Sequence, residues 1–400
     1  MNKKSEKQSA LESISGLGNG TMELPRKFIG SSGNGDPKSV PGEINLNSSL
    51  DDILLYARQQ GASDVHLIVN TPITFKKFGS LTRLGEDVVT PEHTKKWIES
   101  CLTPEQLSRF QATGDLECVY ILDGGGRFRV TLMRERFGWD FTARLIPQTI
   151  RSFEDSGMPP SCQKLTKWAQ GLVLITGPAG CGKTSTLTTL VEMINSSRSD
   201  HIITIENPVE MVYEAKQCQI TQREIGTHTL SQANALRAAL REDPDIIVIS
   251  ELRDLDTIQL AVTAAETGHL VLGTMNTNDA AQTISRLIDS FPPDQQGIIR
   301  NMVSESLRGI ICQQLVPKKD GSGAVPAFEV LMVNAAIANM IRENKVTQIN
   351  NAISIGKSEG MVLLDHSLRN LVQEGIIDGK EAYDRAINPR EFQQFVGGQE

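Results

Sequence analysis

One stretch of the chain, GLVLITGPAGCGKTSTLTTLVEMIN at residues 171–195, constrains the fold more than any other. It contains the pattern G-x-x-x-x-G-K-[ST], whose fixed positions are Gly177, Gly182, Lys183 and Thr184. The apolar run LVLIT before the pattern predicts a buried strand. Apolar residues recur after it at helical spacing, at Leu187, Leu190, Val191 and Ile194. Strand, glycine loop and helix in this order favour phosphate binding, because loop amides and the helix N-terminus then surround the phosphates.

The loop also supplies a charge and a metal ligand. Lys183 adds a positive charge beside the phosphates, and the hydroxyl of Thr184 is a ligand for Mg²⁺. Cys181, inside the loop, is interpreted as a small filler. We therefore predict that the loop binds the phosphates of a nucleotide through Gly177, Pro178, Ala179, Gly180, Cys181, Gly182, Lys183, Thr184 and Ser185.

Two further apolar strands end in carboxylates. HIITIENPVE reaches Glu206 at the end of its apolar run, and DPDIIVISELRD reaches Glu251. Because ligands of parallel sheets bind beyond the carboxyl ends of the strands, we expect both glutamates to converge on the nucleotide. Taken alone, each glutamate could equally be a solvated loop charge. Together with the phosphate loop they predict a site for a metal and an activated water.

A third strand end carries amides instead of carboxylates. In GHLVLGTMNTND, residues 268–279, the strand LVLGTM ends at Asn276, Thr277 and Asn278, which could sense the terminal phosphate. His269 lies just before this strand. It is open to two interpretations, a site residue or a core histidine whose hydrogen bonds are satisfied locally.

The composition divides the chain into four segments. Residues 1–45 are rich in glycine, serine and proline and are predicted to be a disordered tail, since such a segment buries too little apolar area to order itself. Residues 46–150 mix a helix with alternating strands and indicate a small α+β domain. A proline-containing connector spans 151–164. From 165 to 400, strands alternate with helices, so the fold class is α/β with a parallel sheet.

Composition also excludes several classes. A net charge of -8 and a pI of about 5.5 argue against a nucleic-acid-binding protein, which usually carries a basic surface. The six cysteines form no C-x-x-C pair, so we expect no zinc site and interpret them as small buried residues. No apolar run has the roughly 18 residues of a membrane span, and the start of the chain lacks the apolar core of a secretory signal.

Several motifs together resemble the PilT-type motors of the secretion ATPase superfamily, which retract type IV pili. The resemblance runs from about residue 48 to residue 392 and is carried by GASDVHL, the phosphate loop, TIENPVE, QREIGTHT, ALRAALREDPDIIVISELRDLDTI, AAETGHLVLGT and MVSESLRGIICQQL. It implies a PAS-like α+β N-terminal domain, a RecA-like ATPase domain with C-terminal helices, and a homohexameric ring that hydrolyses ATP with Mg²⁺. It also implies a cytoplasmic position at the bacterial inner membrane, an inner-membrane pilus platform protein as partner, and possible contact with other pilus ATPases.

The resemblance assigns roles residue by residue. Glu251 matches the Walker B glutamate that activates water, and Glu206 matches the acidic box that helps to place Mg²⁺ or water. His269 matches the first histidine of the family's histidine box. The arginines that reach the phosphates from the N-terminal domain match Arg127 and Arg129, with Arg144 less certain. Without the family, Arg127 and Arg129 could be one solvated face of a strand.

Three positions depart from the family pattern. Asn207 replaces the aspartate of the acidic box, Asn276 replaces the second box histidine, and Ala338 replaces the arginine of a C-terminal segment linked to retraction. Two hypotheses follow. The chain is an active retraction motor, as the intact phosphate loop and glutamates favour, or it is a weakly hydrolysing accessory or regulatory ring subunit, as the three departures favour. The retraction branch is preferred over extension motors, which usually carry a tetracysteine zinc site and a longer N-terminal module.

Overall fold

The computed structural model describes residues 42–77 and 79–396. Most of the predicted tail, residues 1–41, therefore lies outside the described residues. From residue 42 the chain is ordered against the first domain, where Ile44 packs on the apolar core. None of the helices in the described ranges is both long and apolar enough to cross a lipid bilayer.

The first domain is an antiparallel sheet with three helices. Its strands are β1 (Asp64–Leu67), β2 (Pro72–Lys77), β3 (Ser80–Val88), β4 (Asp115–Leu122), β5 (Gly126–Arg134) and β6 (Trp139–Leu145), and its helices are α2 (Leu50–Gln59), α3 (Pro91–Cys101) and α4 (Pro104–Thr113). The strands pair in the order β3-β2-β1-β6-β5-β4. Leu50, Ile53, Leu54 and Ala57 form the buried face of α2, the helix at the start of this domain.

The segment expected to be a connector contributes to the core of the second domain. Residues 151–164 contain η2 (Glu154–Ser156) and the start of η3 (Pro160–Lys167). Phe153, Met158 and Cys162 are buried and pack with the apolar cluster around the second sheet. This segment is therefore a packed lead-in to the second domain as well as a covalent link.

The second domain is built on a mostly parallel seven-stranded sheet. Its strands are β7 (Gly171–Thr176), β8 (His201–Glu206), β9 (Gln219–Glu224), β10 (Ile246–Ile249), β11 (Leu270–Met275), β12 (Leu307–Pro317) and β13 (Ala324–Met332). They pair in the order β13-β12-β7-β11-β10-β8-β9, and only the β12–β13 pair is antiparallel. Alternating strands and helices thus produce the predicted α/β sheet.

Helices cover both faces of this sheet. The helices of this domain are α5 (Lys183–Ser197), α6 (Gln232–Ala239), α7 (Leu255–Glu266), α8 (Ala280–Asp289), α9 (Gln296–Ser306), α10 (Ala335–Arg342), α11 (Ile349–Ile355), α12 (Leu364–Gln373), α13 (Gly379–Arg385) and α14 (Gln393–Val396), with short turns η4 (Val346–Gln348), η5 (Gly356–Glu359) and η6 (Pro389–Phe392). Helix α5 buries Leu187, Leu190, Val191 and Ile194 on one face, as its spacing predicts, and α7 and α8 pack on the other.

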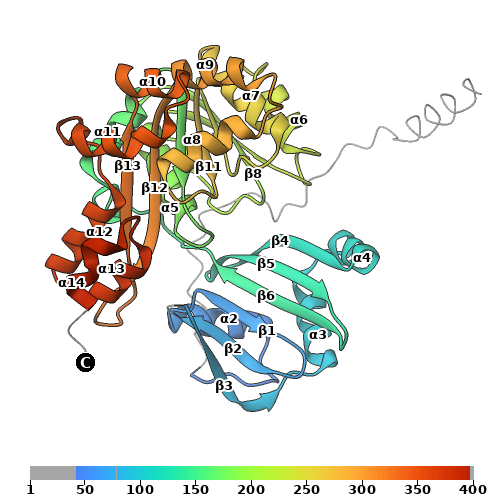
Figure 1. The fold of residues 1–400 in the computed structure, drawn as a ribbon. Coiled ribbons are helices and arrows are strands. Elements are labelled where there is room, and N and C mark those ends of the chain that lie inside the picture. The colour runs from blue at the N-terminus through green and yellow to red at the C-terminus, as the bar shows by residue number, and fades with distance from the viewer. Residues whose placement is uncertain (1–41, 78, 397–400) are drawn as a thin grey trace, which may run out of the picture. The chain divides into compact units, whose positions relative to one another are not determined.

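The C-terminal helices form a satellite core beside the β12–β13 hairpin (Figure 1). Leu364 and Leu368 of α12 and Phe392 of η6 are buried against Val316 and Ala327 of the hairpin. Strand β12 therefore connects two regions, since its other side pairs with β7, the strand that leads into the phosphate loop.

A buried carboxyl group fixes the start of α8, the helix that follows the polar end of β11. Glu329, on β13, has no exposed surface, and its Oε1 accepts a hydrogen bond of 2.8 Å from the backbone N–H of Ala280. Burial raises the pKa of Glu329 to about 7.

We expect this group to make the protein less stable as the pH rises. The pKa of Glu329 is higher in the folded state than in the unfolded chain. At a pH below the unfolded pKa, the group is protonated in both states and its contribution to the free energy of unfolding is fully present. That contribution is lost as the pH rises through about 7. Glu329→Gln should therefore flatten the dependence and stabilise the protein at pH 8 by about 3 kcal/mol, since the rise of the pKa from 4.5 to about 7 is worth about 1.4 kcal/mol per pKa unit. Denaturant unfolding at pH 5 to 8 measures this. Glu266→Gln, at an exposed site, is the control, and parallel curves for wild type and Glu329→Gln would refute the prediction.

Candidate functional site

The phosphate loop connects β7 to α5 in a backbone conformation that glycine permits. Gly177 has φ +145° and Gly182 has φ +96°. A Cβ on Gly177 would lie 2.2 Å from the carbonyl oxygen of Gln313 and 2.6 Å from Sγ of Cys181. Cys181 is buried, as its interpretation as a filler predicts. The two glycines are thus required by the path of the loop against β12.

The start of α5 presents the groups that an anion needs. Helix α5 begins at Lys183, and its N-cap residue Gly182 offers no side-chain cap, so the first amides of the helix remain available. Lys183 Nζ donates to the carbonyls of Gly177 at 2.8 Å and Pro178 at 2.9 Å, which holds the ammonium over the loop. Thr184 and Ser185 are exposed in the first turn.

Sheet register brings the predicted polar residues to the loop's edge of the sheet. Thr176 of β7 pairs with Met275 of β11, and β10 lies between β11 and β8. The carboxyl ends of these four parallel strands therefore share one edge. The phosphate loop and Asn276 follow directly from the ends of β7 and β11, Glu206 is the last residue of β8, and Glu251 lies two residues beyond the end of β10.

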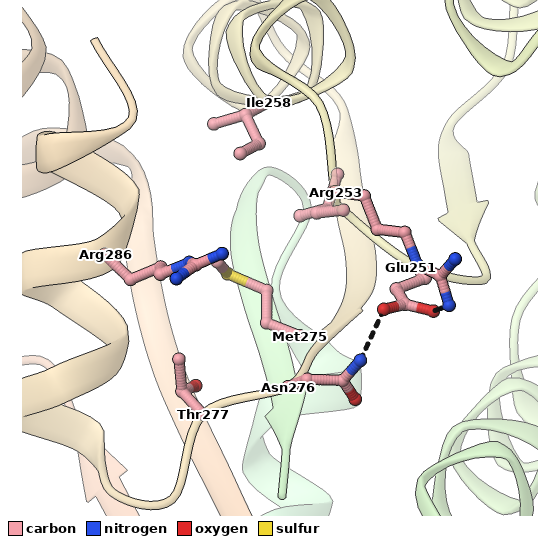
Figure 2. Close-up of a pocket in the computed structure, with 8 residues that line it drawn as sticks. Glu251, Arg253, Ile258, Met275, Asn276, Thr277 and Arg286 are labelled. Carbon is pink, nitrogen blue, oxygen red and sulfur yellow. Dashed lines mark hydrogen bonds and ion pairs between the residues drawn. The ribbon is translucent and has the colours of Figure 1, made fainter. Parts of the chain in front are cut away.

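Glu251 is held between an amide and a guanidinium (Figure 2). Asn276 Nδ2 donates to Oε1 of Glu251 at 2.6 Å, and Arg253 forms an ion pair with Oε2 at 2.7 Å. The Glu251 side chain is 24% exposed. It borders a cavity of about 290 Å³ at the strand ends, whose other lining residues include Thr277, Met275 and Arg286. Its carboxylate is thus fixed in direction and open to solvent.

Glu206 lies in a polar cluster at the end of β8. Its Oε1 accepts hydrogen bonds from Thr204 Oγ1 at 2.7 Å and Gln222 Nε2 at 3.0 Å. Burial raises the pKa of Glu206, the two hydrogen bonds oppose this, and the carboxylates of Glu210 and Glu224 raise it further. Burial therefore disfavours the charged form of Glu206, and a nearby cation would stabilise that form.

The arginines of β5 reach the segment that follows Glu206. Arg127 donates from Nε to the carbonyl of Glu210 at 2.8 Å and from an Nη to that of Val209 at 2.7 Å. Arg129 forms ion pairs with Glu117 and, at 3.0 Å, with Glu210. Neither arginine is freely solvated, so the interpretation as a solvated strand face does not describe them.

Two predicted residues lie apart from this edge. His269 precedes β11 at the opposite end of the strand, where its carbonyl accepts from Gly171 and its Nδ1 lies 3.1 Å from the carbonyl of Ala264. A strand of six residues spans roughly 20 Å, so His269 lies at the end of β11 away from the phosphate loop of its own chain, and its role as a site residue stays a prediction. Arg144 pairs with Asp64 at 2.9 Å inside the first domain.

The remaining departures from the family pattern have different surroundings. Asn207 is exposed and Ala338 is half-buried in α10, whereas Asn276 contacts Glu251 directly. Sequence reasoning missed Gln222, Arg253, Arg286, Gln313 and Gln232, whose Nε2 donates to the carbonyl of Glu251 at 2.8 Å. Arg253 lies only two residues beyond Glu251, so its position in the sequence could have suggested an ion pair between the two side chains. The others reach the site across the fold, and no local pattern indicates them.

This donor set suits a magnesium nucleotide. Hydroxyl and carboxylate oxygens are the ligands that Mg²⁺ prefers, and Thr184, Glu206 and Glu251 provide them at one edge of the sheet. The loop amides and Lys183 suit phosphate oxygens. The arrangement can therefore bind a nucleoside triphosphate and place a carboxylate for water activation.

Comparison with known proteins gives consistent results. Residues 42–384 match the family described as type II/IV secretion system protein. The chain is 40% identical over 343 residues to the type IV pilus retraction ATPase PilT of Pseudomonas aeruginosa. This match covers 86% of the chain and 99% of PilT. It is 41% identical over 330 residues to a twitching motility protein of Neisseria gonorrhoeae, covering 82% and 88%. A crystal structure of the pilus retraction motor PilT with bound ADP has a TM-score of 0.77 and 37% identity, covering 87% of this chain and 99% of that one.

Proposed function

This chain belongs to the type II/IV secretion system protein family, within it to the PilT-type ATPases, and from that premise we propose that it is the motor of type IV pilus retraction. It is an ATP-hydrolysing enzyme of this family. One observation carries the proposal most directly, namely that the phosphate loop and Glu251 follow strands ending at the same edge of the sheet. That arrangement supports hydrolysis as well as nucleotide binding.

The proposed chemistry uses each part of this edge. Loop amides and Lys183 bind the β- and γ-phosphates of ATP. Thr184 and Glu206 would hold Mg²⁺, which neutralises charge on the phosphates when bound. Glu251, oriented by Asn276 and Arg253, accepts a proton from the attacking water. Arg127 and Arg129 supply positive charge from the first domain.

The finer assignments rest on the family resemblance. We infer that residues 46–150 are a PAS-like domain, that residues 165–400 are a RecA-like domain, and that six copies form a ring. The relatives' names place them in pilus retraction and twitching motility. By analogy we infer that the ring acts at the cytoplasmic face of the inner membrane on a pilus platform protein. The weakly hydrolysing accessory subunit is not favoured, since both named relatives resemble the chain over more than four fifths of its length.

Two measurements test this function together. The purified chain should hydrolyse ATP in a Mg²⁺-dependent reaction, and a strain that lacks its gene should keep surface pili but lose twitching. Restored twitching on expression of the chain supports the motor. Normal twitching in the deletion strain, together with negligible turnover of assembled rings, would overturn the proposal in favour of the accessory role.

Arg127 should matter for turnover more than for binding. Its guanidinium is held by the two carbonyls that follow the acidic box, so its charge lies near Glu206 rather than in solvent. We expect Arg127→Ala to reduce kcat about tenfold, the effect of roughly 1.4 kcal/mol at the transition state, while ADP affinity changes less than threefold. Arg83→Ala, on β3, is the control. An Arg127→Ala variant with wild-type kcat would show that this arginine is structural only.

Asn276 and Asn207 should limit the rate. A neutral amide stabilises developing negative charge less than a cation does, since charge-assisted hydrogen bonds are worth roughly 1.5–3 kcal/mol against about 1 kcal/mol for neutral ones. We expect Asn276→His combined with Asn207→Asp to raise kcat several-fold with little change in nucleotide affinity. An unchanged or lower kcat in assembled rings would instead show that the site is adapted to Asn276, which already orients Glu251.

A further inference from the structure

A glutamine on β12 supports the phosphate loop from behind. Gln313 is 5% exposed, and both ends of its side-chain amide are used. Its Nε2 donates to the carbonyl of Cys181 at 2.7 Å, and its Oε1 accepts a hydrogen bond from the hydroxyl of Thr186, which is also buried. One side chain therefore joins the loop to the first turn of α5.

These two contacts lie on either side of the binding groups. Cys181 precedes Gly182 and Lys183 in the loop, and Thr186 follows Thr184 and Ser185 on the helix. Gly182 adopts φ +96°, and a Cβ there would lie 2.8 Å from Nε2 of Gln313. The glutamine thus packs directly beneath the turn where the loop becomes a helix.

The hydrogen bond from Gln313 to the Cys181 carbonyl affects phosphate binding, because it determines which way this loop carbonyl points. A phosphate is bound by amide N–H groups, and a peptide carbonyl turned toward it would repel it. The Cys181 carbonyl is turned inward, where a buried acceptor without a donor costs roughly 1–3 kcal/mol. Gln313 provides that donor. Without it, the peptide gains by rotating its carbonyl toward solvent, on the phosphate side.

The backbone of β12 fixes the other end of the loop. The carbonyl oxygen of Gln313 lies so close to Gly177 that a Cβ added to this glycine would be only 2.2 Å from it. Strand β12 pairs with β7 up to the pair Cys312 and Thr176. Gln313 and Gly177 follow these two residues directly in the chain. The main chain and the side chain of Gln313 therefore contact the first and last glycines of the motif.

We propose that Gln313 is a positioning residue that holds the phosphate loop in its nucleotide-binding conformation. The inference rests on the proposed function, since it assigns a role within that ATP site. Gln313 does not contact the reacting atoms, and it acts through Cys181 and Thr186. It should therefore affect the affinity for nucleotide phosphates more than the chemical step.

Gln313→Met tests this, because methionine keeps the length of the side chain and removes both hydrogen bonds. We expect the Kd of fluorescently labelled ADP and the KM for ATP to rise together by about tenfold, the effect of one unsatisfied buried carbonyl. The kcat should fall less than threefold. Gln314→Met, at the half-buried neighbour on the other face of β12, is the matched control and should leave all three values unchanged.

The hydroxyl partner supplies a second, independent variant. Thr186→Val should weaken ADP binding about threefold, one lost hydrogen bond, and Thr186→Ser should restore the wild-type value. Adding Thr186→Val to Gln313→Met should weaken ADP binding no further, because Gln313→Met already removes the hydrogen bond between Thr186 and Gln313. If Gln313→Met does not fold, as judged by its thermal transition, the Thr186 pair gives the same readout.

The outcomes separate this inference from the proposed function. Folded Gln313→Met and Thr186→Val variants that bind ADP like the wild type would overturn the role of Gln313 alone. A wild-type chain that binds no ADP would overturn the proposed function, and this inference with it. A loss of thermal stability with unchanged Kd and KM would also overturn the inference, because it would show that Gln313 serves only packing.

Discussion

Replacing Lys183 with alanine is expected to lower ATP turnover at least a hundredfold while the fold is retained. The ammonium of Lys183 lies over the phosphate loop, held by the carbonyls of Gly177 and Pro178. As the γ-phosphate is transferred, negative charge shifts within reach of this group. Removing one preorganised charge contact of this kind costs roughly 3 kcal/mol at the transition state, which corresponds to about a hundredfold in rate.

The measurement is steady-state turnover of assembled, purified protein. Thermal unfolding should be close to that of the wild type, because Lys183 is only half-buried and its side chain donates to the backbone carbonyls of Gly177 and Pro178. Lys167→Ala removes an exposed lysine of η3 and should leave turnover unchanged. Substantial turnover in a folded Lys183→Ala protein would be incompatible with ATP hydrolysis at this loop.

Local patterns predicted the parts of the site that lie within single segments. The apolar strand, the glycine loop and the helical face of α5 were all readable from residues 171–195, because each depends on near neighbours in the sequence. The position of Glu206 and Glu251 at the carboxyl ends of their strands could be predicted, because ligands of parallel sheets bind beyond those ends. Their hydrogen-bond partners could not be predicted, because Gln222 and Asn276 come from other strands.

Two helices of the first domain had signals that were not used. Helices α3 and α4 each begin with threonine at the N-cap and proline at the next position. Thr90 and Thr103 start reciprocal caps with His93 and Gln106, a pattern that predicts a helix start. The alternating segments around them favour strands instead, so the sequence predicts one helix here where the described residues form three.

Other features cannot be predicted from local sequence at all. Gln313 lies more than a hundred residues beyond the loop, and only the pairing of β12 with β7 brings them together. The same reasoning applies to the position of His269. The sequence places it on the strand that carries Asn276, but a strand has two ends, and the parallel register puts His269 beside Gly171 at the far one.

The contact between Asn276 and Glu251 also limits what the departures from the family pattern mean. Asn276 cannot carry a charge, yet it donates to the carboxylate that would act on water. Arg253 contacts the other oxygen of the same carboxylate. The substitution therefore keeps a donor for Glu251 while it removes a titratable group, and this is compatible with an active enzyme.

Glu251→Gln is expected to abolish hydrolysis while ATP binding persists. Glutamine keeps the size and the acceptor oxygen of the side chain, so the contact with Asn276 can remain, but its amide cannot accept a proton from water. General bases contribute typically 10²–10⁴-fold to a rate, and we expect kcat to fall by at least a hundredfold. The Kd for ATP should change less than threefold, because the phosphates are bound by the loop and Lys183.

The same experiment distinguishes between the two carboxylates of the site. Glu206 accepts hydrogen bonds from Thr204 and Gln222 on one oxygen, and the family resemblance assigns it to the placing of Mg²⁺ or water. Glu206→Gln should therefore shift the Mg²⁺ concentration needed for half-maximal turnover, whereas Glu251→Gln should lower kcat at every Mg²⁺ concentration. Glu242→Gln, at an exposed position after α6, is the control for both. If Glu251→Gln hydrolyses ATP at near the wild-type rate and Glu206→Gln does not, the two roles are reversed, and the base lies at the end of β8.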